Sequence, residues 1–163
     1  MNNAPFQDSC SPLVVENMRL DQLGEVMLVE RSAYPFPWTQ GMFESSLASS
    51  DDCKVLISDG KILGYCIVSY ILDEAHLLNL CIHPDYSGQG LGRFLLKAMI
   101  EIALDKKCSM FFLEVRVSNS HAINLYFSEG FNEVGLRPNY YPAGQGREDA
   151  LLMTLDLSLD LYV

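Results

Sequence analysis

The stretch His83-Pro84-Asp85-Tyr86-Ser87-Gly88-Gln89-Gly90-Leu91-Gly92-Arg93 places three glycines at alternate positions directly before an amphipathic segment. Glycine lets several backbone N–H groups converge without obstruction by a Cβ atom. Together with the N-terminus of the following helix, those N–H groups suit an anion such as a pyrophosphate. The spacing fits neither a P-loop nor G-x-G-x-x-G, whose third glycine would stand where Arg93 is. The alternative is a flexible turn at a helix start.

Strand and helix patterns alternate on both sides of the glycines. The segment 91–106 has apolar residues at helical spacing, which predicts a helix with a buried stripe. That stripe comprises Leu91, Phe94, Leu95, Ala98, Met99, Ile102 and Ala103. We predict strands over 75–82, 110–117, 131–136 and 150–157, a helix over 120–129, and a long loop over 137–149.

The first half of the chain contains further strands and two helices. We predict a short strand at 13–15, a helix over 18–33, and a helix from Thr39 as N-cap to about residue 48. Asp59-Gly60 between two β-rich runs, 54–58 and 61–72, is a strong hairpin signal. The fold class is therefore α/β, with a mixed sheet of about seven strands and helices on both faces. We expect one domain over residues 13–157, a loose lead-in over 1–12 and a tail over 158–163.

Composition excludes several classes of protein. The chain has 163 residues and a net charge of −10, which opposes nucleic-acid binding and suits a cationic partner. Five scattered cysteines form no C-x-x-C pair, and several lie in apolar runs, so we expect reduced thiols. They are Cys10, Cys53, Cys66, Cys81 and Cys108. With no signal peptide and no membrane-length apolar run, the expectation is a cytoplasmic protein that binds no membrane.

Glu114 interrupts the apolar run 110–117, which otherwise suits an inner strand. A carboxylate at such a position is partly desolvated, and a carboxylate in that setting can act as a general base. The alternative is an ordinary ion pair with Arg116, its neighbour on the same face of the strand.

Asn119 and Tyr126 lie about two helical turns apart, so both can face one crevice. N-capping of helix 120–129 alone would explain Asn119, and a tyrosine on a packed helix is usually a core residue. The three histidines, His76, His83 and His121, lack ligand spacing, so we expect no metal site.

The order of elements, the glycine loop and the strand and helix after it resemble the GCN5-related N-acetyltransferase (GNAT) family. The pyrophosphate signature of that family is Gln/Arg-x-x-Gly-x-Gly/Ala, and residues 87–92 match it except that Ser87 stands at the first position. Further motifs over residues 13–157 resemble the bacterial RimI-type members, which acetylate the N-terminal alanine of a small-subunit ribosomal protein. These motifs are Tyr34-Pro35-Phe36-Pro37-Trp38, Leu113-Glu114-Val115-Arg116-Val117-Ser118-Asn119, Ala122-Ile123-Asn124-Leu125-Tyr126, Arg137-Pro138-Asn139-Tyr140-Tyr141-Pro142 and Gly146-Arg147-Glu148-Asp149-Ala150.

The resemblance implies acetyl-CoA as the acetyl donor, no metal, and direct transfer to an α-amine. Glu114 would take a proton from that amine through a water, and Tyr126 would protonate the departing thiolate. The backbone of Leu80, Cys81 and Ile82 would hold the pantetheine arm. The other implied cofactor contacts are Gly88, Gln89, Gly90, Leu91, Gly92, Arg93 and Asn119.

The resemblance also places two aromatic loops over one acceptor groove. The implied substrate contacts are Phe36, Trp38, Tyr140, Tyr141, Glu148 and Asp149. The acidic residues and the net charge favour a basic peptide, here the N-terminal segment of the ribosomal protein. In the alternative, the aromatics close the core and 147–149 is a solvated turn. Two rival functions stay open: acetylation of other N-termini or small amines, and acyl-CoA binding without turnover.

Overall fold

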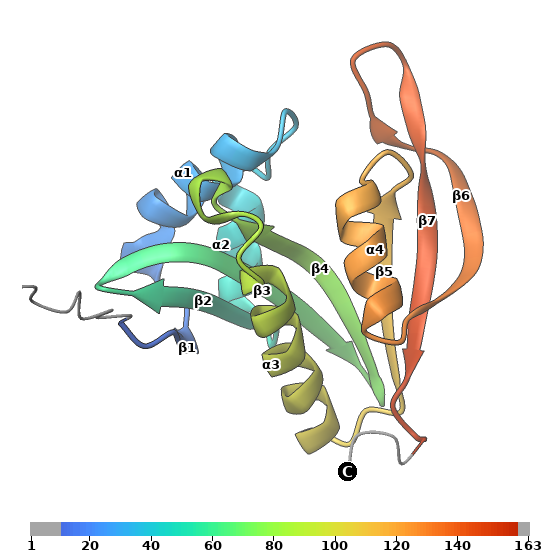
Figure 1. Ribbon diagram of the computed structural model, residues 1–163, viewed down its shortest axis with the longest axis horizontal. Coiled ribbons are helices and arrows are strands. Elements are labelled where there is room, and N and C mark those ends of the chain that lie inside the picture. Colours follow the sequence, from blue (N-terminus) through green and yellow to red (C-terminus); the bar gives the residue numbers. More distant parts are fainter. Residues whose placement is uncertain (1–10, 160–163) are drawn as a thin grey trace, which may run out of the picture.

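The computed structural model describes residues 11–159, which form one seven-stranded sheet in the order β1-β2-β3-β4-β5-β7-β6 (Figure 1). The strands are β1 (Val14–Asn17), β2 (Asp52–Ser58), β3 (Lys61–Ile71), β4 (Glu74–Ile82), β5 (Met110–Arg116), β6 (Asn132–Pro142) and β7 (Arg147–Asp156). The helices are α1 (Leu23–Ala33), α2 (Gln40–Ala48), α3 (Leu91–Asp105) and α4 (Ser120–Ser128), with short 3-10 turns at Leu20–Gln22 and Pro84–Tyr86. Only β4 and β5 pair in parallel, so the sheet is mixed, as predicted.

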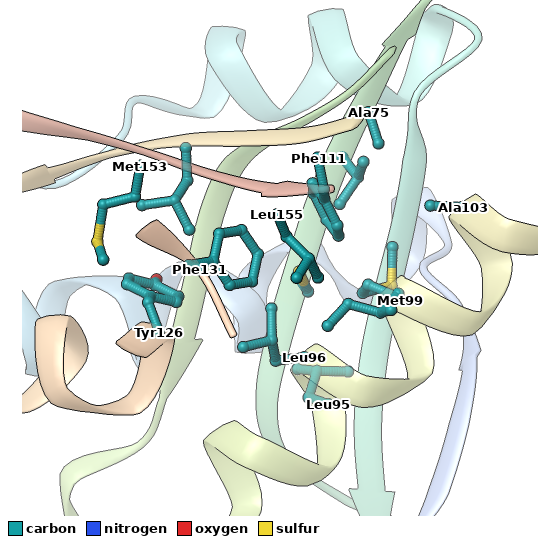
Figure 2. Close-up of a cluster of buried hydrophobic side chains, with 14 of the residues drawn as sticks. Ala75, Leu95, Leu96, Met99, Ala103, Phe111, Tyr126, Phe131, Met153 and Leu155 are labelled. Carbon is teal, nitrogen blue, oxygen red and sulfur yellow. The ribbon is translucent and has the colours of Figure 1, made fainter. Parts of the chain in front are cut away.

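Helices cover both faces of the sheet because the central strand β3 is apolar on both sides. Tyr65 and Ile67 pack in one buried cluster with residues of α1 and α2. Cys66 and Val68, which alternate with them, belong to the cluster under α3 and α4. Figure 2 shows this second cluster, in which side chains of α3 meet side chains of α4, β5 and β7. The predicted fold class is confirmed.

Local signals in the sequence account for several element ends. The Thr39 side chain accepts a hydrogen bond from the Met42 N–H and caps α2. Asp59 and Gly60 both have positive φ, 51° and 70°, as a tight hairpin between β2 and β3 requires. Gly130, just past α4, has a φ of 95°, which glycine adopts without strain. The predicted Thr39 cap and Asp59-Gly60 hairpin are confirmed.

The predicted loop over 137–149 is wrong. Most of it belongs to the β6–β7 hairpin, in which Tyr141 pairs with Glu148 and Pro142 with Arg147. The pairing shifts register between Arg137 and Tyr141, which conceals the alternation typical of a strand. Proline is tolerated there because β6 is an edge strand.

Two details of the helices also differ from prediction. The helix expected over 18–33 begins as an α-helix only at Leu23, after the 3-10 turn. On α3, Phe94 is 43% exposed, whereas Leu96 and Ile100 are buried. The apolar stripe is therefore rotated toward Leu96, because this side of α3 packs on the sheet.

The predicted lead-in and tail lie almost entirely outside the described residues, as does Cys10. Cys53, Cys66, Cys81 and Cys108 are free and buried, which agrees with the expectation of small hydrophobic thiols. Within residues 11–159, no helix is long and apolar enough to cross a membrane.

Candidate active site

A groove opens where β4 and β5 separate. The two strands pair only from Glu74–Leu77 of β4 to Met110–Leu113 of β5, and beyond these residues they diverge (Figure 1). The groove has a volume of about 1130 Å³ and is lined by β4, β5, β6 and the loop between α1 and α2. This volume exceeds that of typical small-molecule pockets, so the groove can take an extended ligand together with part of a second one.

The β4 wall presents Leu80 to the groove, and a register shift at Leu78 precedes it. The Leu80 carbonyl accepts a 2.8 Å hydrogen bond from the Tyr34 hydroxyl. Cys81, which alternates with Leu80, is buried beneath the strand, and burial raises the pKa of its thiol to about 12. Cys81 is therefore a packing residue with a protonated thiol rather than a nucleophile.

The glycine loop lies at the end of β4, beyond the groove lining. Gly88 and Gly90 have φ values of 73° and 77°, and Gly90 is the left-handed N-cap of α3. As a glycine, Gly90 has no side chain with which to cap α3, so the first N–H groups of this helix suit an anion. A Cβ on Gly92 would lie 3.8 Å from Ile82, which places the first turn of α3 against the last residue of β4. The loop geometry therefore fits a phosphate.

Of the other residues in this loop, Gln89 is exposed and Leu91 is buried in the core. The Arg93 guanidinium pairs with the buried carboxylate of Glu129 at the end of α4. The Arg93 side chain is thus engaged within the protein, by a residue of the neighbouring helix end.

Glu114 lies on the β5 wall and is 27% exposed. Its Oε1 is 2.9 Å from Nη2 of Arg137, whereas Arg116 pairs with Glu148 at 2.8 Å. The ion pair considered from the sequence, between Glu114 and Arg116, therefore does not form. A partly exposed carboxylate in the groove is accessible to water and can accept a proton.

Tyr126 of α4 lines the groove and is 6% exposed. Its ring packs on Phe131, with the centroids 5.7 Å apart. Burial raises the pKa of Tyr126 above its ordinary value, so the hydroxyl keeps its proton at neutral pH. Asn119, the N-cap of α4, accepts a 3.2 Å hydrogen bond from the Ala122 N–H and also lines the groove.

The four predicted aromatic contacts, Phe36, Trp38, Tyr140 and Tyr141, all line the groove. Arg116 connects their two segments, because its guanidinium lies 4.5 Å from the ring centroid of Tyr141 and 5.6 Å from that of Phe36. These four aromatic residues therefore form one continuous wall of the groove, the aromatic wall, although they come from two separate segments.

Glu148 and Asp149 do not line the groove. Glu148 accepts hydrogen bonds from Arg116 and from the Ser118 N–H, and the bond from Arg116 is the main cause of its lowered pKa. Asp149 accepts a 2.8 Å hydrogen bond from the backbone N–H of Asn139. Both carboxylates hold the β6–β7 hairpin in place.

Several groove residues escaped the sequence reasoning: Glu30, Tyr34, Asn79 and Arg137. The available signal was an acidic residue, Glu30, at a helical position that should be apolar. In the part of the chain that the structure describes, no three His, Cys, Asp or Glu side chains gather as a metal site requires.

Comparison with known proteins agrees with this geometry. Residues 23–131 match the model of the acetyltransferase (GNAT) family. The [ribosomal protein bS18]-alanine N-acetyltransferase of Escherichia coli is 39% identical over 145 residues, which are 89% of this chain and 98% of that protein.

Solved structures show the same fold. The crystal structure of the ribosomal-protein-S18-alanine N-acetyltransferase from Escherichia coli matches with a TM-score of 0.86 and 38% identity, over 93% of this chain and 100% of that one. The yncA protein from Salmonella typhimurium, a putative acetyltransferase with acetyl-CoA bound, matches with a TM-score of 0.76 and 18% identity, over 90% of this chain and 95% of that one. The chain belongs to the GNAT family and is an acetyltransferase.

Proposed function

We propose that this chain transfers the acetyl group of acetyl-CoA to the α-amine of the N-terminal alanine of ribosomal protein bS18. One observation carries the proposal: a carboxylate, Glu114, and a protonated phenol, Tyr126, line the same groove as the aromatic wall. The name of the Escherichia coli relative supports the choice of acceptor.

The reaction needs one proton acceptor and one proton donor. An α-amine has a pKa of about 8, so a minority of it is neutral at pH 7 and can attack the thioester carbonyl carbon. As the C–N bond forms, the amine proton passes through a water to Glu114. As the C–S bond breaks, Tyr126 donates its proton to the thiolate of coenzyme A and later recovers one from solvent.

The donor lies along β4 and its pyrophosphate on the glycine loop. Backbone groups of Leu80, Cys81 and Ile82 hold the pantetheine arm, and the N–H groups of residues 88–93 bind the pyrophosphate. Asn119 contacts the donor from the start of α4. The uncapped N-terminus of α3 and the gap between β4 and β5 support this placement.

The acceptor peptide lies against the aromatic wall. Phe36, Trp38, Tyr140 and Tyr141 contact its first residues. Glu148 and Asp149 lie outside the groove lining and already accept hydrogen bonds within the protein, so they act on the peptide only through their charge. With the net charge of −10, they favour a basic peptide.

A comparison of acceptors tests this specificity. Coenzyme A release is measured with an alanine-first, arginine-containing peptide, with the same peptide beginning with other residues, and with a polyamine. The proposal predicts the highest kcat/KM for the alanine-first peptide. A higher kcat/KM for the polyamine would refute it in favour of a small-amine acetyltransferase. Tight coenzyme A binding without turnover of any amine would indicate a binding module.

A further inference from the structure

One buried carboxylate beside the groove has no part in the chemistry above. Glu30 of α1 is 1% exposed, yet it belongs to the groove lining. Its Oε1 accepts a 2.8 Å hydrogen bond from the backbone N–H of Trp38. Its Oε2 accepts from the Tyr65 hydroxyl and, at 3.4 Å, from Nδ2 of Asn79.

Every donor to this carboxylate is uncharged. Within residues 11–159, no lysine, arginine or histidine lies within ion-pair distance of Glu30. A buried carboxylate without a cation is an expensive way to stabilise a fold, since an apolar residue could fill the same space. We therefore look for the role of Glu30 in the three segments that its hydrogen bonds join.

The donors come from three elements that meet at the groove. Trp38 belongs to the loop between α1 and α2, Tyr65 to β3, and Asn79 to β4 next to the register shift. The hydrogen bond from Tyr34 to the Leu80 carbonyl adds a second link between the same loop and β4. The loop that carries two aromatic acceptor contacts is thus fixed to the strand along which we place the donor.

We propose that Glu30 is a positioning residue that sets where the acceptor loop lies relative to β4, and so the approach of the amine to the thioester. The role of the loop in acceptor binding rests on the proposed function, whereas its attachment to Glu30 does not. Acyl transfer requires the reacting atoms to lie about 3–3.5 Å apart, and a misplacement of about 1 Å can cost a factor of about 10² in rate.

Two substitutions separate the hydrogen bonds from the charge. Glu30→Ala removes all three bonds. Glu30→Gln can keep them, because its oxygen still accepts from the Trp38 N–H, while its amide can donate to the Tyr65 hydroxyl and to a flipped Asn79 side chain. Val26→Ala is the matched control: Val26 lies one turn earlier on α1, is fully buried in the apolar cluster that contains Tyr65, and does not line the groove.

The first measurement needs no substrate. Trp38 is the only tryptophan in the sequence, so fluorescence excited at wavelengths that tyrosine does not absorb reports on this loop. Glu30→Ala should shift the emission to longer wavelength and increase quenching by acrylamide. Glu30→Gln and Val26→Ala should match the wild type. An unchanged emission in Glu30→Ala would overturn the proposal, as would the same change in Val26→Ala.

The second measurement is steady-state kinetics with an alanine-first basic peptide. Glu30→Ala should lower kcat/KM for the peptide by about 10- to 100-fold, while KM for acetyl-CoA stays within about twofold. Glu30→Gln should restore most of the activity. Equal losses in both Glu30 variants would overturn the positioning role, because the charge would then be what matters. If the fluorescence behaves as expected but the wild type does not acetylate the peptide, the proposed function fails and the attachment of the loop stands.

Discussion

Replacing Glu114 by glutamine tests whether this side chain is the general base of the reaction. The substitution keeps the shape of the side chain and removes its capacity to accept a proton. Removing a general base costs about 10²- to 10⁴-fold in rate, equivalent to about 3–5 kcal/mol of activation free energy. The lost ion pair with Arg137 joins side chains that are 27% and 50% exposed. Such a pair contributes about 0–1 kcal/mol to the free energy of unfolding.

The catalytic effect should therefore far exceed the effect on stability. We expect kcat, measured as coenzyme A release at saturating peptide and acetyl-CoA, to fall at least about 100-fold. Affinity for coenzyme A by calorimetry and the melting temperature should hardly change. Glu74→Gln is the control, because Glu74 is another half-exposed strand carboxylate with a side-chain partner, Nε2 of His76 at 3.0 Å, and it does not line the groove. Comparable losses of kcat and of coenzyme A affinity in Glu114→Gln would refute the role of base.

Three further substitutions test other parts of the account. Tyr126→Phe keeps the ring packing, so it should lower kcat by about 10²-fold without changing the melting temperature, and full activity would remove its role as acid. The hydrogen bond from Arg116 lowers the pKa of Glu148, so the stability it contributes is present at neutral pH and is lost as the pH falls through that lowered value. In urea titrations, Arg116→Met should therefore destabilise the protein more at pH 7 than at about pH 3, and an equal effect at both would contradict this. Gly64→Ala places a Cβ 2.5 Å from the Cys81 carbonyl oxygen, so it should lower the free energy of unfolding by about 1–3 kcal/mol. It should also weaken the affinity for coenzyme A, measured by calorimetry. An unchanged affinity would mean that this part of β4 does not bind the donor.

The parts of the fold that the sequence predicts well depend on neighbours in the chain. Thr39 bonds a residue three positions on, the turn at Asp59 and Gly60 needs only two positive φ angles, and Asn119 caps its own helix. Each of these interactions joins residues only a few positions apart, so residue type and spacing suffice to predict it.

The parts that the sequence does not predict depend on contacts between distant residues. The carboxylate of Glu114 finds Arg137 on β6 rather than Arg116, two positions away, because the side chain of Arg116 turns to Glu148. Glu30 bonds Tyr65 and Asn79, which lie 35 and 49 positions further along the chain. No local pattern marks such partners, since they meet only when the sheet has formed.

The β6–β7 hairpin shows a second limit of sequence reasoning. Two prolines and a shift in register remove the regular alternation from residues 137–142, so the segment has the composition of a loop although it pairs as an edge strand. The family motif predicts a functional role for these residues, although their composition alone predicts a loop. Their irregular pairing places Tyr140 and Tyr141 over the groove.

The most direct test of the account is the site of acetylation on a defined acceptor. The protein is incubated with acetyl-CoA and an alanine-first, arginine-containing peptide, and in parallel with the same peptide blocked at its N-terminus and carrying an internal lysine. Fragmentation mass spectrometry then locates the acetyl group. We expect acetylation of the free alanine α-amine and none of the blocked peptide. Acetylation of the lysine, or no product on either peptide from protein that binds coenzyme A, would contradict it.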